Sequence, residues 1–168
     1  QRLSFEVLAQ RLGSQLDPVL RILEVGGKEL AFNDDSVGAD SRLAWRCEKE
    51  GEYLVELRDV TYRGGAGFGY RLRTGDFPIV SAPYPLRVEQ GKPTKISIAG
   101  LDSSSIEARD VLLPEGSNGR AFNLAALLPG GTSSSFVTIL SSDLPELLEN
   151  EPNNQARSAA RVSHPCAI

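Results

Sequence analysis

The side chains best suited to chemistry are oxygen donors gathered near the C-terminal end of the chain. Two carboxylates and two amides stand close together there, on Glu149, Glu151, Asn153 and Asn154. Calcium takes roughly six to eight oxygen ligands, so a cluster of acids and amides on a flexible segment is suitable material for a site. The pattern predicts either a calcium site or a solvated acidic linker.

A second group of oxygen donors lies in the first quarter of the chain, on Asn33, Asp34, Asp35 and Asp40. Its spacing does not fit an EF-hand loop, which needs a glycine and a later glutamate at fixed positions. Two interpretations stay open. The segment has a calcium-binding or structural role, or its Asx side chains cap their own backbone turns.

Residues for catalysis are scarce. The chain has one histidine, His164, and nothing in the sequence pairs it with a serine or with Cys47. A catalytic triad needs a base oriented beside its nucleophile, so we expect a protein that is not an enzyme. Cys47 and Cys166 fit no metal-binding spacing, and the sequence leaves open whether they form a disulfide or remain thiols.

Composition excludes further classes of function. The formal net charge of −4 gives no electrostatic footprint for nucleic acid, so we expect no nucleic-acid partner. No apolar run approaches the ~20 residues of a membrane-spanning helix. The glycine-rich segment 64–69 lacks the spacing of a phosphate-binding loop and predicts a flexible hairpin loop instead.

Short alternating runs predict strands throughout the first half. From Leu3 to Ala9 apolar residues occupy every second position, which is typical of a half-buried strand. Gly26 and Gly27 indicate a hairpin turn. Further strands are expected at 19–25, 29–32, 43–47, 53–60 and 70–73, which together predict an antiparallel β-sandwich over residues 1–75.

The rest of the chain divides into three parts. Prolines punctuate residues 76–85, which we expect to be a linker. Residues 86–143 carry further short apolar runs and predict a small immunoglobulin-like β domain. Residues 144–168 then form a second linker and the opening of a further unit.

Two pieces of the sequence together resemble the bacterial pre-peptidase C-terminal domain. The first is the sandwich core, with LDPVLRILEVGGKELAFNDDS, DSRLAW, GEYLVELRDV and GFGYRLR in order. The second is ENEPNN, residues 149–154, which is similar to the motif that opens such a domain. The resemblance implies a jelly-roll-like sandwich that lacks its first strands.

In this family the opening motif precedes the sandwich, whereas here it follows one. One interpretation is a slice of a tandem array from a large exported bacterial protein, cut out of phase. The other is that the tail, from its own chain or from a neighbouring copy, fills the missing sandwich edge by strand addition.

The resemblance implies a non-catalytic module in an extracellular, periplasmic or cell-surface location. Its expected role is binding or adhesion to a protein or a polysaccharide, with calcium as a candidate stabilising ion, since collagen-binding relatives bind calcium through the opening motif. The alternative is a purely structural spacer that assists secretion or assembly of a neighbouring catalytic domain. A binding module should show an exposed aromatic patch, and a spacer should show charged faces.

Overall fold

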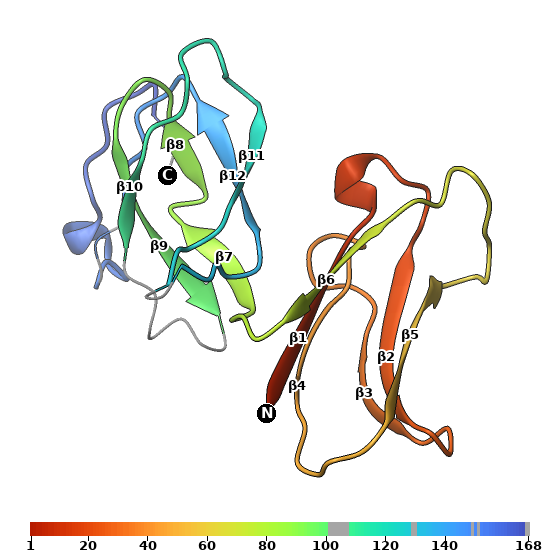
Figure 1. Ribbon diagram of the computed structural model, residues 1–168. Helices are drawn as coiled ribbons and strands as arrows, with labels where there is room; N and C mark the ends of the chain where they lie inside the picture. Colours follow the sequence, from red (N-terminus) through yellow and green to blue (C-terminus); the bar gives the residue numbers. More distant parts are fainter. Residues whose placement is uncertain (101–107, 129–130, 149, 151, 167–168) are drawn as a thin grey trace.

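A computed structural model covers the chain and describes all residues except 101–107, 129–130, 149, 151 and 167–168. The chain forms two small β units, one after the other along the sequence (Figure 1). Each unit consists of two three-stranded sheets. The prediction of an all-β, sandwich-type chain is therefore confirmed.

The first unit packs two sheets face to face. One has the order β4 (Arg42–Arg46), β1 (Arg2–Leu8), β6 (Arg71–Gly75), and the other has the order β3 (Glu29–Asn33), β2 (Pro18–Glu24), β5 (Tyr53–Asp59). All their pairings are antiparallel. Between the sheets lies one apolar cluster, formed by Phe5, Val7, Ala9, Leu16, Leu20, Ile22 and Leu43.

The two glycine-containing connections of this unit have different outcomes. The hairpin expected at Gly26 and Gly27 joins β2 to β3, and Gly27 takes the positive φ of 86° that such a turn requires. The segment 64–69 is not the expected hairpin loop, because β5 and β6 belong to different sheets. It crosses from one sheet to the other and is held there by the Gln15 N–H, which donates to the Gly67 carbonyl over 2.9 Å.

The second unit repeats the two-sheet plan. Its sheets have the orders β10 (Arg109–Val111), β9 (Thr94–Gly100), β7 (Val80–Tyr84) and β11 (Ala121–Leu124), β12 (Val137–Ser142), β8 (Arg87–Glu89). The β8–β12 pair is parallel and the other pairs are antiparallel. Its separate core comprises Val80, Val88, Ile96, Ile98, Val111, Leu113, Leu124, Ala126, Val137 and Ile139.

Strand β7 corrects the expected linker of residues 76–85. It pairs with β9 and places Val80, which is fully buried, in the core of the second unit. Proline lacks a backbone N–H and is tolerated in a sheet mainly at an edge. Because β7 is an edge strand, it can carry Pro83, and the sequence pattern of prolines therefore conceals a strand.

Strand β1 corrects a second expectation, since it is buried on both faces. Phe5 and Val7 face the core of the sandwich, as predicted, but Ser4 and Glu6 on the opposite face are also fully buried. The alternation of apolar and polar residues predicted a solvent-exposed second face. The second unit covers that face instead.

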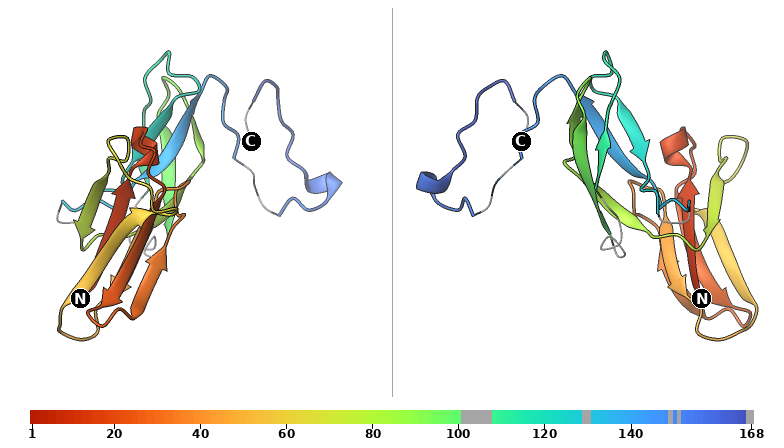
Figure 2. Two further views of the ribbon diagram at one scale, coloured as in Figure 1. Left: turned by 90° about the vertical axis from the view of Figure 1, so that its right-hand side faces the viewer. Right: turned by 60° about the vertical axis from the view of Figure 1, so that its left-hand side comes forward.

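The C-terminal tail has no strand in its described residues from 152 to 166, where a single 3₁₀ turn, η3 (Ala156–Ser158), is the regular element. Figure 2 shows the tail looping away from the second unit. Within the part of the chain that the structure describes, no helix is long and apolar enough to cross a membrane.

Substitution of Gly100 tests the pairing of β7 with β9. A Cβ at this position would lie 2.6 Å from the Val80 Cα and 2.7 Å from the Ile79 carbonyl oxygen, both of which are backbone atoms. We expect Gly100→Ala to lower the free energy of unfolding by about 1–3 kcal/mol, as overpacking typically does. Gly26→Ala is the control, because no atom lies within 4 Å of the added Cβ. Urea unfolding followed by circular dichroism measures both, and equal stabilities would contradict the pairing.

Candidate functional site: a buried ionic junction between the two units

A row of charged side chains crosses the outer face of the sheet β4–β1–β6. Glu6 is at the centre of β1, and its direct cross-strand neighbours are Arg42 on β4 and Arg73 on β6. The Arg42 Nε lies 3.5 Å from the Glu6 Oε1, and the Arg73 Nη1 lies 3.7 Å from the Glu6 Oε2. The Glu6 side chain is fully buried and that of Arg42 is 1% exposed. Opposite charges on directly paired strands stabilise each other, so the sheet register itself assembles this row.

Each member of the row also bonds to the backbone of the second unit. The Phe136 N–H donates to the Glu6 Oε1 over 3.1 Å, and the Arg42 Nη1 donates to the Val80 carbonyl over 2.6 Å. Arg73 donates to two successive carbonyls, those of Ser134 over 2.7 Å and Ser133 over 2.6 Å. The row therefore joins the central strand of the first unit to the segment that precedes β12 and to the start of β7.

Small residues beside the charged row allow the backbones to approach. In the next cross-strand position, Ser4 pairs with Ala44 on one side and Gly75 on the other. The Ser4 hydroxyl donates to the Phe77 carbonyl over 2.5 Å. Phe77 is buried, and the Arg73 guanidinium lies 4.0 Å above its ring, a distance at which a cation–π interaction is favourable. Polar and apolar contacts thus close the junction together.

A second ion pair supports the row from the edge of the first unit. The Arg11 Nε donates to the Asp40 Oδ2 over 2.7 Å, and the Arg11 Nη2 lies 3.4 Å from the Glu6 Oε1. The buried Asp40 carboxylate also accepts the backbone N–H groups of Ala9 and Gln10, over 3.1 and 2.8 Å. It therefore caps the 3₁₀ turn η1 (Gln10–Leu12) and fixes the guanidinium beside Glu6.

Burial is costly for this cluster. The pKa of Arg42 is lowered to about 10, mainly because burial disfavours its charge. The Glu6 carboxylate opposes this shift, the positive charge of Arg11 adds to it, and Asp40 opposes it. Arg42 therefore stays charged at neutral pH. Among the described residues, the Glu6 Oε2 and the Arg42 Nε and Nη2 have no hydrogen-bond partner. The ion pairs with Arg73 and Glu6 are the contacts that stabilise the Glu6 Oε2 and the Arg42 Nε. Removing one member would leave the others as buried unpaired charges, which is strongly destabilising.

The groups of the junction hold the two units together. Its carboxylates are occupied by arginine side chains and backbone N–H groups, and it holds neither His164 nor a cysteine. His164 is exposed in the tail. Cys47 and Cys166 are both unpaired thiols.

The predicted cluster in the first quarter of the chain is divided by its hydrogen bonds. The Asn33 Oδ1 accepts the Ser36 hydroxyl over 2.9 Å and the Arg42 N–H over 2.8 Å, and the Asp34 Oδ1 accepts the Asp35 N–H over 3.0 Å. Asp40 points to η1 and Arg11, as described above. Asp34 therefore bonds to adjacent backbone, as the capping interpretation expects, whereas Asn33 links the two ends of the loop and Asp40 bonds to backbone about thirty residues away.

Asp17, which lies near this loop, is repelled by neighbouring carboxylates. The pKa of Asp17 is raised, first by burial and then by the negative charges of Asp35 and Asp59, with Arg63 opposing them and Asp34 adding to them. A bound cation would relieve such repulsion, so calcium at this end of the loop stays a prediction. The described residues hold no group of three or more His, Cys, Asp or Glu side chains with the geometry to bind a metal ion.

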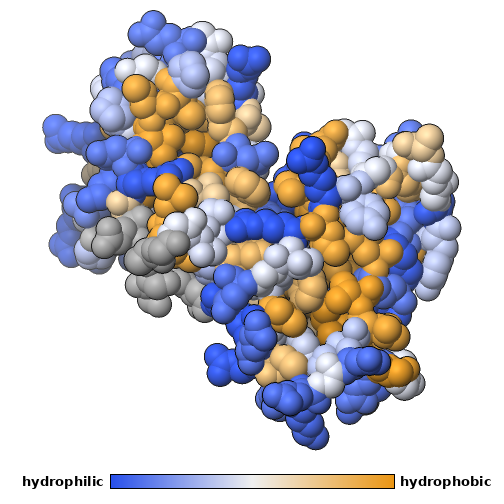
Figure 3. Space-filling view, viewed as in Figure 1, coloured by the Kyte–Doolittle hydropathy of each residue, from blue (hydrophilic) through white to orange (hydrophobic). Residues whose placement is uncertain are grey.

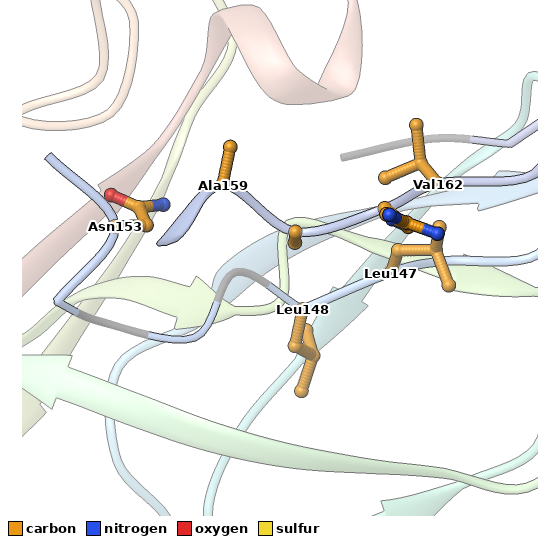
Figure 4. A pocket seen from close by; sticks show the side chains of 7 residues that line it. Leu147, Leu148, Asn153, Ala159 and Val162 are labelled. Carbon is orange, nitrogen blue, oxygen red and sulfur yellow. The ribbon is translucent and has the colours of Figure 1, made fainter. Parts of the chain in front are cut away.

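The predicted cluster in the tail is only partly within view. Glu149 and Glu151 lie outside the described residues, and Asn154 is exposed. Asn153 lines a hollow of ≈ 310 Å³ with other residues of the tail itself, which Figure 4 shows. The rest of its lining is Leu147, Leu148, Ala159, Ala160, Arg161 and Val162.

The ionic junction was missed by sequence reasoning. Glu6, Arg42 and Arg73 each occupy the polar phase of an alternating strand, and that pattern normally marks a solvent-facing position. One signal was available. The first predicted strand carries one acid, while strands that could pair with it carry arginines, but only the register shows that they meet.

The chain was compared with protein-family models, with curated proteins and with solved structures, and none of them matches. The resemblance to the pre-peptidase C-terminal domain therefore stays an expectation from the sequence.

Paired substitutions separate the capping role of Asp40 from calcium binding. We expect Asp40→Asn to lower the free energy of unfolding by about 1–3 kcal/mol, because buried N–H donors and Arg11 lose a charged acceptor. Asp34→Asn is the control and should change it by less than about 0.5 kcal/mol. Thermal unfolding in millimolar calcium and then in chelator should give the same midpoint for the native chain. A calcium-dependent rise that Asp34→Asn abolishes would show that the loop binds the ion.

Proposed function

We propose that this chain is a non-catalytic spacer, in which two β units are fixed to each other so that they hold neighbouring parts of a larger protein at a set distance and angle. The observation that carries this proposal is the buried row of Glu6, Arg42 and Arg73, which bonds to the backbone of the second unit. Flexible linkage is the default between small domains unless their interface is extensive. A buried junction that fixes the two units to each other is what a spacer of set length and angle requires.

The exposed faces support the same role. The outer face of β2 and β5 carries an ion-pair ladder, in which Arg21 contacts Glu29 and Glu56, and Arg58 also contacts Glu56. Of the exposed aromatic residues, Phe32 lies on β3, Tyr84 lies on β7, and Tyr62 and Tyr70 lie in the connection from β5 to β6. Charged faces are what the structural role predicts.

Binding to a protein or a polysaccharide is the second candidate, and Tyr62 favours it. This residue is 76% exposed and adopts a φ of 59°, which non-glycine residues adopt rarely. The Arg58 guanidinium lies 4.2 Å above its ring and holds it at the surface. A single arginine-supported tyrosine at a loop end is a smaller feature than the junction, so the spacer role is preferred. Export to a bacterial cell surface is proposed from the sequence resemblance alone.

The spacer role predicts that the two units tumble as one body. Backbone ¹⁵N relaxation should give the same rotational correlation time for both units of the native chain. Arg73→Ala removes the donors to Ser133 and Ser134 and the contact with Phe77, so we expect shorter and unequal correlation times for the two units. Because Glu6 also loses a partner, we expect a lower free energy of unfolding, and circular dichroism checks that both β units are still folded. Arg71→Ala is the matched control, because Arg71 is an exposed arginine on the same strand. Independent tumbling in the native chain would contradict the proposal.

A further inference from the structure

The first sandwich is open along one side. Strand β5 pairs only with β2, and β6 pairs only with β1, within the described residues. Figure 1 shows each of them at the edge of its own sheet, with β2 drawn between them. Both therefore present unpaired backbone N–H and C=O groups there, and such edges recruit further strands.

Apolar side chains are exposed along this opening, which we call the open seam. Val55 on β5 lies opposite the core residue Ile22, and Leu72 on β6 lies opposite the core residue Val7. Both therefore face the inside of the sandwich, where side chains are normally covered. Yet Val55 is 43% exposed and Leu72 is 36% exposed. Figure 3 shows the resulting hydrophobic surface between β6 and β5.

The backbone of the open seam specifies what would cover it. A lipid or a flat protein surface would cover Val55 and Leu72 but leave the edge N–H and C=O groups unpaired. An added strand satisfies both requirements, because its backbone completes the ladder while alternate side chains fill the seam. The occupant should therefore be an extended, proline-free segment with small or apolar residues at every second position.

The tail of this chain contains such a segment. Residues 153–164 have no proline, and residues 154–165 are exposed. In an extended conformation Ala160 and Val162 would share one face, and Arg157 and Arg161 would share the other. The apolar face suits the seam. The basic face would point outward on the side of Glu56, whose carboxylate already contacts Arg21 and Arg58, so the apolar face is the one that matches the seam.

The position of the tail indicates whether it adds to the sandwich of its own chain or to that of a second molecule. Figure 1 and the right-hand view of Figure 2 both place the tail on the far side of the second unit from the first. Its apolar residues line the hollow within the tail, and Val162 remains 47% exposed. We propose that residues 157–163 of one copy add as an edge strand to β5 of a second copy, so that two chains exchange tails. This inference is independent of the spacer role.

The test uses light scattering with size-exclusion chromatography on the full chain over a range of concentrations. Reciprocal exchange closes as a dimer, so we expect the mass to rise about twofold with concentration. Val55→Asp should keep the chain monomeric. Leu54→Asp is the matched control, because Leu54 is the adjacent residue on the opposite face of β5, is 49% exposed, and should leave association unchanged.

A second variant keeps the proposal falsifiable if Val55→Asp fails to fold. Val162→Asp alters the exposed tail and should also abolish association. Amide hydrogen exchange of Tyr53–Asp59 should slow as the dimer forms in the native chain and stay fast in Val162→Asp. A native chain that stays monomeric at every concentration would overturn the proposal, as would association that survives Val162→Asp.

Discussion

The buried carboxylate of Glu6 is the group on which the arrangement of this protein depends. It sits on the central strand of a sheet, between two arginines supplied by the neighbouring strands, and it accepts an N–H from the other unit. A carboxylate without partners at this depth would cost many kcal/mol, and a lost partner in a buried pair typically costs about 3–5 kcal/mol. The first sandwich therefore needs the second unit to complete the surroundings of its own central strand. Small domains bury only about 60% of the surface of their unfolded chain, and here the second unit covers a face that the first cannot cover alone.

Two sides of the first sandwich differ in polarity and in burial. The outer face of β1 is polar and buried at Ser4 and Glu6, whereas the open seam between β5 and β6 is apolar and exposed at Val55 and Leu72. Covering a charged face demands matched partners in fixed positions, which gives one rigid geometry. An apolar edge demands only an extended segment of suitable pattern, which another chain can supply. A fixed internal spacing combined with an adaptable edge suits a module that links parts of a larger assembly.

Strands that alternate cleanly were predictable from the sequence, and those whose environment depends on a distant segment were not. The strands of the first unit lie within a residue or two of their expected positions, and the Gly26–Gly27 turn joins β2 to β3 as expected. Strand β7 was mistaken for a linker because Pro83, which its edge position tolerates, and the prolines that flank it suggested an irregular segment. The burial of Glu6 was missed because alternation of apolar and polar residues predicts which face of a strand is in the core. It does not show whether another part of the chain covers the polar face. For Asp40 the sequence left open a calcium site or a cap on its own turn, and neither interpretation could foresee that its carboxylate bonds to the distant backbone of η1.

Amide hydrogen exchange of Phe136 tests the central claim most directly. This N–H belongs to the second unit, lies just before β12, and has the Glu6 carboxylate of the first unit as its acceptor. If the ionic junction fixes the two units together, the Phe136 amide should be protected as strongly as the core amides of β1 and should exchange only when the first unit unfolds. Fast exchange at Phe136, at the rate of an exposed loop while β1 stays protected, would show that the junction opens freely and would contradict this account.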